Sequence, residues 1–246
     1  MLLRRVAAAI ALAVSAAVVV PSTASAAEVK NPVIVVAGLS GVATAYEPLA
    51  GRLRNDGYLV FVYQLPGLGF GDIRDSARAF SSYVAQLKNY YGFTKVDVVG
   101  HSEGGLVTRY YLKNLGGTAS VQRYISLGTP QYGTYLANII AFFGLGDCLT
   151  IVACQQMTIG SSFLEALNDG DDSPGYVRYT TVRTLQDELV RPTSNAAIEG
   201  ATNVLIQAYC PLRVVGHLGL IVDGTTYTIV RGALADAAVN PNCWAI

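Results

Sequence analysis

The sequence predicts an α/β protein in which a mostly parallel central sheet is covered by helices on both faces. The run at residues 33–36 is apolar at every position, as expected of a strand that is buried on both faces, and several other short runs are strand-like. Helical patterns separate these runs, and strands that alternate with helices imply crossover connections in a parallel sheet. The chain has 246 residues, of which 52% are hydrophobic and 14% charged, so it can form a large core and is not intrinsically disordered.

The predicted elements follow one another along the chain. Strands are expected at residues 33–36, 58–64, 96–99, 121–127, 177–184 and 204–208. Helices are expected at residues 46–55, 73–90 and 104–115, and Asp72 is the expected N-cap of the second helix. Gly67, Gly69 and Gly71 do not have the G-x-G-x-x-G spacing of a nucleotide-binding loop, and no lysine lies nearby, so they predict a turn.

The N-terminal segment explains part of the high mean hydropathy, which is +0.38. Residues 1–5 include two arginines, residues 6–20 are almost entirely apolar, and the small residues Ala24, Ser25 and Ala26 follow. This order is typical of a secretory signal peptide, so residues 1–26 are expected to be removed from an extracellular single-domain protein, residues 27–246. An uncleaved anchor helix is the alternative, but about 15 apolar residues are fewer than the roughly 20 that span a bilayer. No later stretch is apolar enough to cross a membrane.

Export to an oxidising compartment predicts that the four cysteines form two disulfides. Proximity in the sequence favours pairing Cys148 with Cys154 and Cys210 with Cys243. A zinc site is the alternative, but the chain has no C-x-x-C pair and only two histidines. No bound metal is therefore expected.

The sequence Gly100-His101-Ser102-Glu103-Gly104 has the pattern G-x-S-x-G between a predicted strand and a predicted helix. A strand that turns abruptly into a helix holds its serine in a strained conformation with the hydroxyl exposed, and the glycines leave room for this turn. The N-terminus of the helix also directs free N–H groups toward developing negative charge. A glycine-rich turn with an ordinary serine is the alternative. The position between strand and helix favours Ser102 as a nucleophile.

A nucleophilic serine needs a general base, and two histidines are available. His101 is adjacent to the serine, where chain geometry directs its side chain elsewhere, so we expect it to pack or hydrogen-bond beside the site. His217 lies in a stretch with the composition of an exposed loop. His217 is therefore the candidate base that accepts the serine proton and returns it to the leaving group.

The acid that orients the histidine should fall between the serine and the histidine in the sequence. Asp187 comes soon after the strand at residues 177–184, at the carboxyl edge of the sheet, where active sites of open α/β sheets gather. Glu188 is the alternative to Asp187. Asp171 and Asp172 are interpreted as solvated charges of a turn.

An oxyanion hole needs two backbone N–H donors. One is expected from Glu103, directly after the nucleophile, and the other from Leu39, in the loop that follows the first strand. The carboxylate of Glu103 is not needed for this role. We expect it to pair with a nearby arginine such as Arg109.

Several segments match one known family in combination: residues 33–41, 100–105 and 127–130, the segment around Asp187, and residues 217–218. Together they resemble the secreted bacterial class 2 triacylglycerol lipases of the α/β-hydrolase superfamily, especially those of actinobacteria. The resemblance implies a compact α/β-hydrolase fold, hydrolysis of carboxylic esters and no cofactor. The resemblance also assigns the site residues: Ser102 as nucleophile, Asp187 as acid, His217 as base, and Leu39 and Glu103 as oxyanion donors. Many relatives have His-Gly where this chain has Ala37-Gly38, a change that leaves the backbone donor in place.

Apolar side chains near these motifs predict a cleft for an acyl chain. Residues 136–157 are strongly apolar and are interpreted as a cap or acyl-binding wall, with an ordinary buried helix as the alternative. The candidate substrate contacts are Leu68, Phe70, Phe142 and Phe143.

The sequence as a whole predicts a secreted serine hydrolase that cleaves acyl esters or lipids through an acyl-enzyme on Ser102. A cutinase-like polyester hydrolase or an acyltransferase would use the same residues, and a non-catalytic binding protein is the alternative outside the enzymes. Seventeen basic and seventeen acidic side chains cancel, so the chain lacks the charge expected of a nucleic-acid-binding protein. A monomer is expected.

Overall fold

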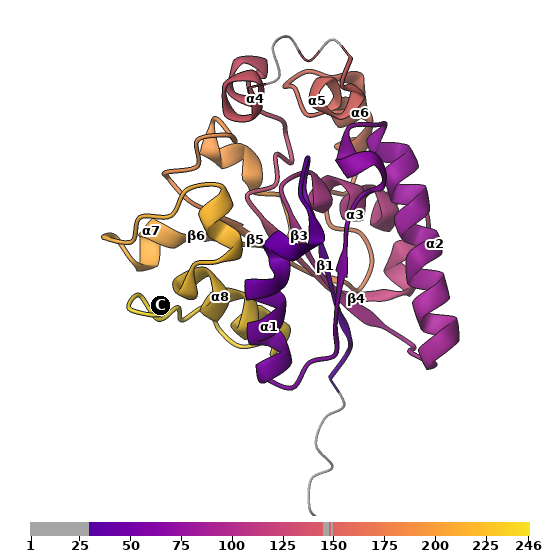
Figure 1. The fold of residues 1–246 in the computed structure, drawn as a ribbon, viewed down its shortest axis with the longest axis vertical. Coiled ribbons are helices and arrows are strands. Elements are labelled where there is room, and N and C mark those ends of the chain that lie inside the picture. The colour runs from indigo at the N-terminus through magenta and orange to yellow at the C-terminus, as the bar shows by residue number, and fades with distance from the viewer. Residues whose placement is uncertain (1–29, 145–147, 149) are drawn as a thin grey trace, which may run out of the picture.

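A parallel six-stranded sheet organises the residues that the computed structural model describes, which are 30–144, 148 and 150–246 (Figure 1). Its strands are β1 (Val33–Val36), β2 (Val60–Tyr63), β3 (Val96–His101), β4 (Val121–Leu127), β5 (Arg178–Arg183) and β6 (Thr202–Leu205). They lie in the order β2-β1-β3-β4-β5-β6, and every neighbouring pair is parallel. The predicted α/β fold is therefore confirmed. The expected signal peptide, residues 1–26, lies outside the described residues.

Helices connect the strands and cover the sheet. They are α1 (Glu47–Asn55), α2 (Ile73–Tyr91), α3 (Glu103–Asn114), α4 (Leu136–Phe143), α5 (Val152–Gln156), α6 (Ser162–Leu167), α7 (Ile206–Tyr209) and α8 (Gly224–Leu234). Short 3-10 helices occur at Ala43–Tyr46, Pro66–Gly69, Gly117–Ala119, Thr193–Ala196 and Leu218–Ile221. The N-terminus of α2 is capped as predicted, because the Asp72 side chain accepts a hydrogen bond from the N–H of Arg74 at 2.7 Å.

Strand β1 is apolar at every position because both of its faces are buried. Successive side chains of a strand point to opposite faces of the sheet. Ile34 and Val36 lie in the core that is shared with α2 and α3, whereas Val33 and Val35 lie in the core that is shared with α1 and α8. All four side chains are fully buried, so the sheet has an apolar core on each face.

The predicted strand at residues 204–208 is wrong in its extent. Strand β6 begins two residues earlier, at Thr202, and ends at Leu205, where α7 begins. The N–H of Cys210 bonds to the carbonyl of Ile206 at 2.8 Å and closes this helical turn. A short apolar run does not distinguish a buried strand from a buried helix, which explains the error.

The direction in which successive strands are added to the sheet reverses once, between β1 and β3. The chain passes from β1 to β2 on one side, then crosses back to β3 on the other side and continues toward β6. The carboxyl ends of β1 and β3 therefore form the switch point at which open α/β sheets bind ligands. Helices α4, α5 and α6 lie together beyond this end of the sheet, at the top of Figure 1.

Two disulfides lie outside the sheet, and both have the pairing that proximity favours. Cys148–Cys154 joins the segment after α4 to α5, and Cys210–Cys243 joins the end of α7 to the C-terminal tail. Among the described residues, no helix has both the length and the apolar character that a bilayer crossing needs.

Candidate active site

Ser102 occupies a sharp turn between β3 and α3. Its φ of 53° and ψ of −128° are rare for a residue other than glycine, and its N–H bonds to the carbonyl of Leu127 at 2.9 Å. A Cβ atom on Gly104 would lie 2.5 Å from the carbonyl oxygen of Val36, and one on Gly100 would lie 2.8 Å from the Cα of Gly105. The glycines of the G-x-S-x-G pattern are therefore required by close backbone contacts, as the sequence predicts.

The expectation that the Ser102 hydroxyl is exposed is wrong. Ser102 is only 2% exposed, and its Oγ has no hydrogen-bond partner among the described residues. Helix α4 contributes to the enclosure of the site, because the ring of Phe142 packs edge-on against His217 with 5.4 Å between ring centroids.

His217 is held on almost every side. Its Nδ1 lies 3.1 Å from Oδ1 and 3.0 Å from Oδ2 of Asp187, its N–H donates to Glu188 at 2.8 Å, and its carbonyl accepts from His101 and from the N–H of Leu220. Nε2 is the polar atom of His217 that has no partner within the described chain. The ring is thus oriented so that only Nε2 is available to a reacting group.

The side chain of His217 is buried, although the loop that carries it is exposed as expected, with Val214 77% and Leu218 57% exposed. His217 is 1% exposed and Asp187 is also 1% exposed. The carboxylate of Glu188, an exposed residue, lies against this loop at Gly216, where a Cβ atom would lie 2.7 Å from its Oε1. Asp187 faces the imidazole and Glu188 binds the backbone, so the geometry favours Asp187 over Glu188 as the orienting acid.

The end of β4 brings Ser102 and the Asp187–His217 pair to the same edge of the sheet. The carbonyl of Leu127 accepts the hydrogen bond from the N–H of Ser102. The next residue, Gly128, has a φ of 54°, and a Cβ atom there would lie 3.0 Å from Oδ2 of Asp187 and 3.1 Å from Nδ1 of His217. Glycine is required at residue 128 because a side chain would displace this pair. Ser102 Oγ and His217 Nε2 are both buried at this edge, and neither is bonded to the other.

The two expected oxyanion donors follow the neighbouring strands β1 and β3. Leu39 follows β1 and Glu103 is the first residue of α3, at the switch point of the sheet. No described residue accepts a hydrogen bond from either backbone N–H. The loop that carries Leu39 is fixed at its neighbour, because the N–H of Ser40 donates to the carbonyl of Leu68 at 2.7 Å.

The expected pairing of Glu103 with Arg109 is wrong. Glu103 is fully buried, neither carboxyl oxygen has a hydrogen-bond partner in the described part of the chain, and burial raises the pKa of this carboxyl well above its usual value. Six residues are about 1.7 helical turns, so Glu103 and Arg109 project from different sides of α3. Arg109 instead pairs with Asp172 and donates to Asn168 Oδ1 at 2.6 Å. Asp172, expected to be a solvated charge, is only 8% exposed.

The candidate substrate contacts lie partly around the same edge. Phe142 contacts His217, and both Phe142 and Phe70 pack against the apolar core that contains Leu39. Leu68 lies on the turn that binds the N–H of Ser40. Phe143 is the last residue of α4, and its side chain lies outside the described part of the structure.

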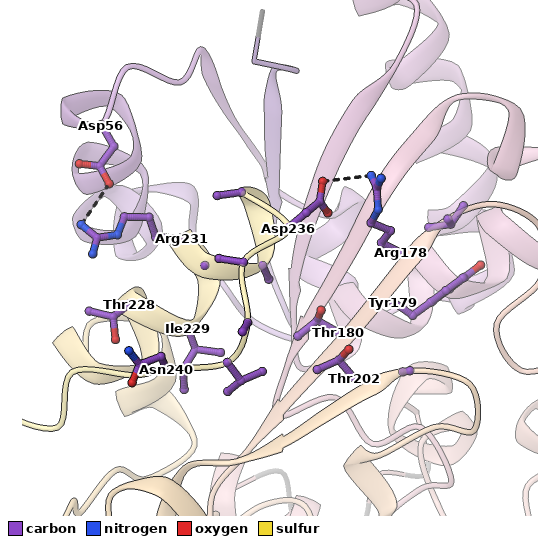
Figure 2. Close-up of a pocket in the computed structure, with 18 of the residues that line it drawn as sticks. Asp56, Arg178, Tyr179, Thr180, Thr202, Thr228, Ile229, Arg231, Asp236 and Asn240 are labelled. Carbon is purple, nitrogen blue, oxygen red and sulfur yellow. Dashed lines mark ion pairs between the residues drawn. The ribbon is translucent and has the colours of Figure 1, made fainter. Parts of the chain in front are cut away.

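A cavity of about 1100 Å³ opens at the other end of the sheet, at the amino ends of β5 and β6 (Figure 2). Ion pairs between Arg178 and Asp236 and between Arg231 and Asp56 line it. Some buried polar side-chain atoms of the described residues have no hydrogen-bond partner. None of these atoms belongs to a residue that lines this cavity. The unpartnered reactive groups lie instead at the carboxyl edge. Among the described residues, no group of three or more His, Cys, Asp or Glu side chains is arranged to hold a metal ion.

Comparison with known proteins agrees with the fold. The family model described as alpha/beta hydrolase fold matches residues 31–147. The chain is 28% identical over 190 residues to a triacylglycerol lipase of Burkholderia plantarii, an alignment that covers 72% of this chain and 52% of that protein. It is 27% identical over 170 residues to a triacylglycerol lipase of Pseudarthrobacter phenanthrenivorans, covering 64% of this chain and 53% of the relative. The chain therefore spans about half the length of the curated relatives that it matches.

A solved structure shows the same fold. The crystal structure of Aspergillus fumigatus lipase B aligns with a TM-score of 0.71 and 20% identity over 84% of this chain and 52% of that chain. Together with the parallel sheet and the family match, this likeness shows that the chain has an α/β-hydrolase fold. The curated proteins that it resembles are triacylglycerol lipases.

Proposed function

We propose that this chain is a serine carboxylic-ester hydrolase of the lipase or esterase type, with Ser102 as nucleophile, His217 as general base and Asp187 as orienting acid. The observation that carries the proposal is the position of His217. Every polar atom of this buried residue is bonded except Nε2, at the edge of the sheet where Ser102 occupies its strained turn. The names of the curated relatives support the same activity.

The proposed reaction has two steps. His217 Nε2 accepts the proton of Ser102 while Oγ attacks the ester carbonyl, and the developing oxyanion accepts hydrogen bonds from the N–H groups of Leu39 and Glu103. The carboxylate of Asp187 stabilises the imidazolium. The protonated imidazole then donates its proton to the leaving alcohol, and water attacks the acyl-enzyme with His217 acting again as base.

The proposed substrate is an acyl ester or lipid whose chain contacts apolar side chains beside the nucleophile. Phe142 lies against His217, and Phe70 packs on the same apolar core as Leu39. This arrangement leaves the acyl chain next to aromatic surface while the carbonyl faces the backbone donors. The disulfides and the N-terminal pattern support export to an oxidising compartment.

A fluorophosphonate probe and p-nitrophenyl esters test the proposal together. The wild-type chain should react with one equivalent of probe and hydrolyse the esters, while Ser102→Ala should do neither and keep its circular dichroism spectrum. Ser82→Ala is the control, because this exposed serine on α2 lies outside the site. A folded Ser102→Ala protein that still hydrolyses esters would exclude Ser102 as the nucleophile.

A further inference from the structure

A line of hydrogen bonds joins the loop that carries Leu39 to the backbone of His217. The N–H of Gly38 donates to the hydroxyl of Tyr46 at 2.8 Å, and this hydroxyl lies 3.0 Å from Nδ1 of His101. Nε2 of His101 lies 3.2 Å from the carbonyl oxygen of His217. Tyr46 ends the 3-10 helix before α1, and His101 is the last residue of β3. The connection therefore runs through two side chains that the reaction itself does not use.

One protonation state satisfies every atom of this connection. Because the Tyr46 oxygen already accepts from Gly38, its own proton is directed to Nδ1 of His101. The ring proton of His101 then resides on Nε2 and is donated to the carbonyl of His217. Both side chains are uncharged near neutral pH, since burial lowers the pKa of His101 to about 3 and raises the pKa of Tyr46 to about 12.

One end of the connection contacts the proposed nucleophile, and the other contacts the proposed base. Gly38 directly precedes Leu39, and a Cβ atom on Gly38 would lie 2.8 Å from the Cβ of Ser102, so this loop packs against the nucleophile. At the other end, the ring of His101 lies 4.8 Å from the ring of His217, measured between centroids. A shift of either loop would change where the oxyanion donors and the base lie relative to each other.

We propose that Tyr46 and His101 are positioning residues that hold the oxyanion loop, residues 38–41, at a fixed place relative to His217. This inference rests on the proposed ester hydrolysis and extends it to residues that touch neither substrate nor the reacting atoms. A donor acts on the transition state only when it lies within hydrogen-bond distance of the oxyanion, so a small displacement of the loop lowers kcat. Ground-state binding of a small ester depends much less on this alignment.

The first test is Tyr46→Phe, which removes the hydroxyl and keeps the ring in the core. We expect kcat for p-nitrophenyl butyrate, divided by the concentration of probe-reactive serine, to fall about tenfold while KM changes by less than about twofold. The matched control is Tyr227→Phe. The hydroxyl of Tyr227 bonds to the carbonyl of Arg52 at 3.0 Å and to Asp56 at 2.6 Å, away from Ser102, so its loss should lower thermal stability and leave kcat unchanged.

A double-mutant cycle tests whether Tyr46 and His101 act together or affect kcat independently. His101→Gln removes the imidazole acceptor for Tyr46, while its amide can still donate to the carbonyl of His217. If the two residues act as one connection, Tyr46→Phe combined with His101→Gln should be no slower than the slower single variant. Multiplicative losses in kcat would overturn the proposal.

The remaining outcomes are also distinct. A wild-type chain that neither reacts with the fluorophosphonate probe nor hydrolyses the ester would refute the proposed function, and the positioning role with it. A wild-type chain that does both, together with a folded Tyr46→Phe variant of unchanged kcat, would refute the positioning role alone. If Tyr46→Phe does not fold, His101→Gln is compared with Tyr227→Phe instead. A lower kcat with little change in KM in His101→Gln alone supports the positioning role, and an unchanged kcat refutes it.

Discussion

Asp187 contacts the His217 imidazole with both carboxylate oxygens, at 3.1 Å and 3.0 Å from Nδ1. The carboxylate is itself fixed, because Oδ1 also accepts from the N–H groups of Leu189 at 2.9 Å and Val190 at 2.8 Å. The backbone after β5 therefore determines where the imidazole points.

Asp187→Asn should lower kcat/KM for ester hydrolysis by about 10³ to 10⁴. An amide can orient the ring but cannot stabilise the imidazolium, and it can favour the wrong tautomer. The matched variant is Glu188→Gln, in which the amide oxygen can still accept from the N–H of His217, and its loss should stay below about tenfold. Steady-state kinetics on the two purified proteins checks this. A greater loss in Glu188→Gln would make Glu188 the acid.

Glu103→Gln should reduce the pH dependence of stability. The buried carboxyl has a pKa raised well above the 4.5 of the free group, so the unfolded chain releases this proton at lower pH than the folded chain does. Wild-type stability is therefore lost as pH rises from about 4.5 toward the raised folded value, whereas a glutamine at this position has no proton to release. Urea unfolding of both proteins at about pH 5, 7 and 9 checks this. The variant should gain relative to wild type as pH rises above about 5, until the folded carboxyl also ionises, and parallel curves would show that Glu103 is not buried as a neutral acid.

Asp172→Asn should destabilise the protein by about 3 to 5 kcal/mol without changing kcat, because it leaves the fully buried guanidinium of Arg109 without its ion-pair partner. Urea unfolding together with ester kinetics at low temperature measures both effects. The control is Asp75→Asn, whose pair with Arg78 is exposed on α2 and should contribute no measurable stability. Equal stabilities of the two variants would contradict the role of the buried pair.

Phe142→Ala should change the preference for acyl-chain length. Since its ring lies beside His217, its removal takes apolar contact from a long acyl chain, and the ratio of kcat/KM for octanoate to that for acetate should fall about tenfold. Phe93→Ala is the control, because Phe93 stacks on Tyr91 near the end of α2. An unchanged ratio in Phe142→Ala would place the acyl chain elsewhere.

The sheet and the strained turn were predictable because local patterns determine them. Strand β4 has the predicted bounds, residues 121–127, and Gly128 follows it directly. The turn at Ser102 follows from small residues that are needed within two positions of the serine. The choice of His217 depended on the presence of only two histidines in the sequence.

Features that depend on distant segments were not predictable in this way. The side chain of His217 is buried, and its backbone is bonded to Glu188 and His101 from other parts of the chain, although its neighbours form an exposed loop. Arg109 was expected to pair with a residue nearby in sequence, and it pairs with Asp172 across the fold. Tyr46 looked like an ordinary helix residue, and nothing in its local sequence indicates a contact with His101.

The backbone of Ser102 carries a cost that is independent of chemistry. A residue with a side chain at φ 53° and ψ −128° is strained, by about 1 to 3 kcal/mol, whereas glycine adopts such angles easily. Ser102→Gly should therefore unfold at higher urea concentration than Ser102→Ala, which keeps a Cβ atom at the same position. At residue 102, folding stability alone would therefore favour glycine, whereas the proposed catalysis needs the serine hydroxyl. Catalytic activity and folding stability make opposite demands on this position.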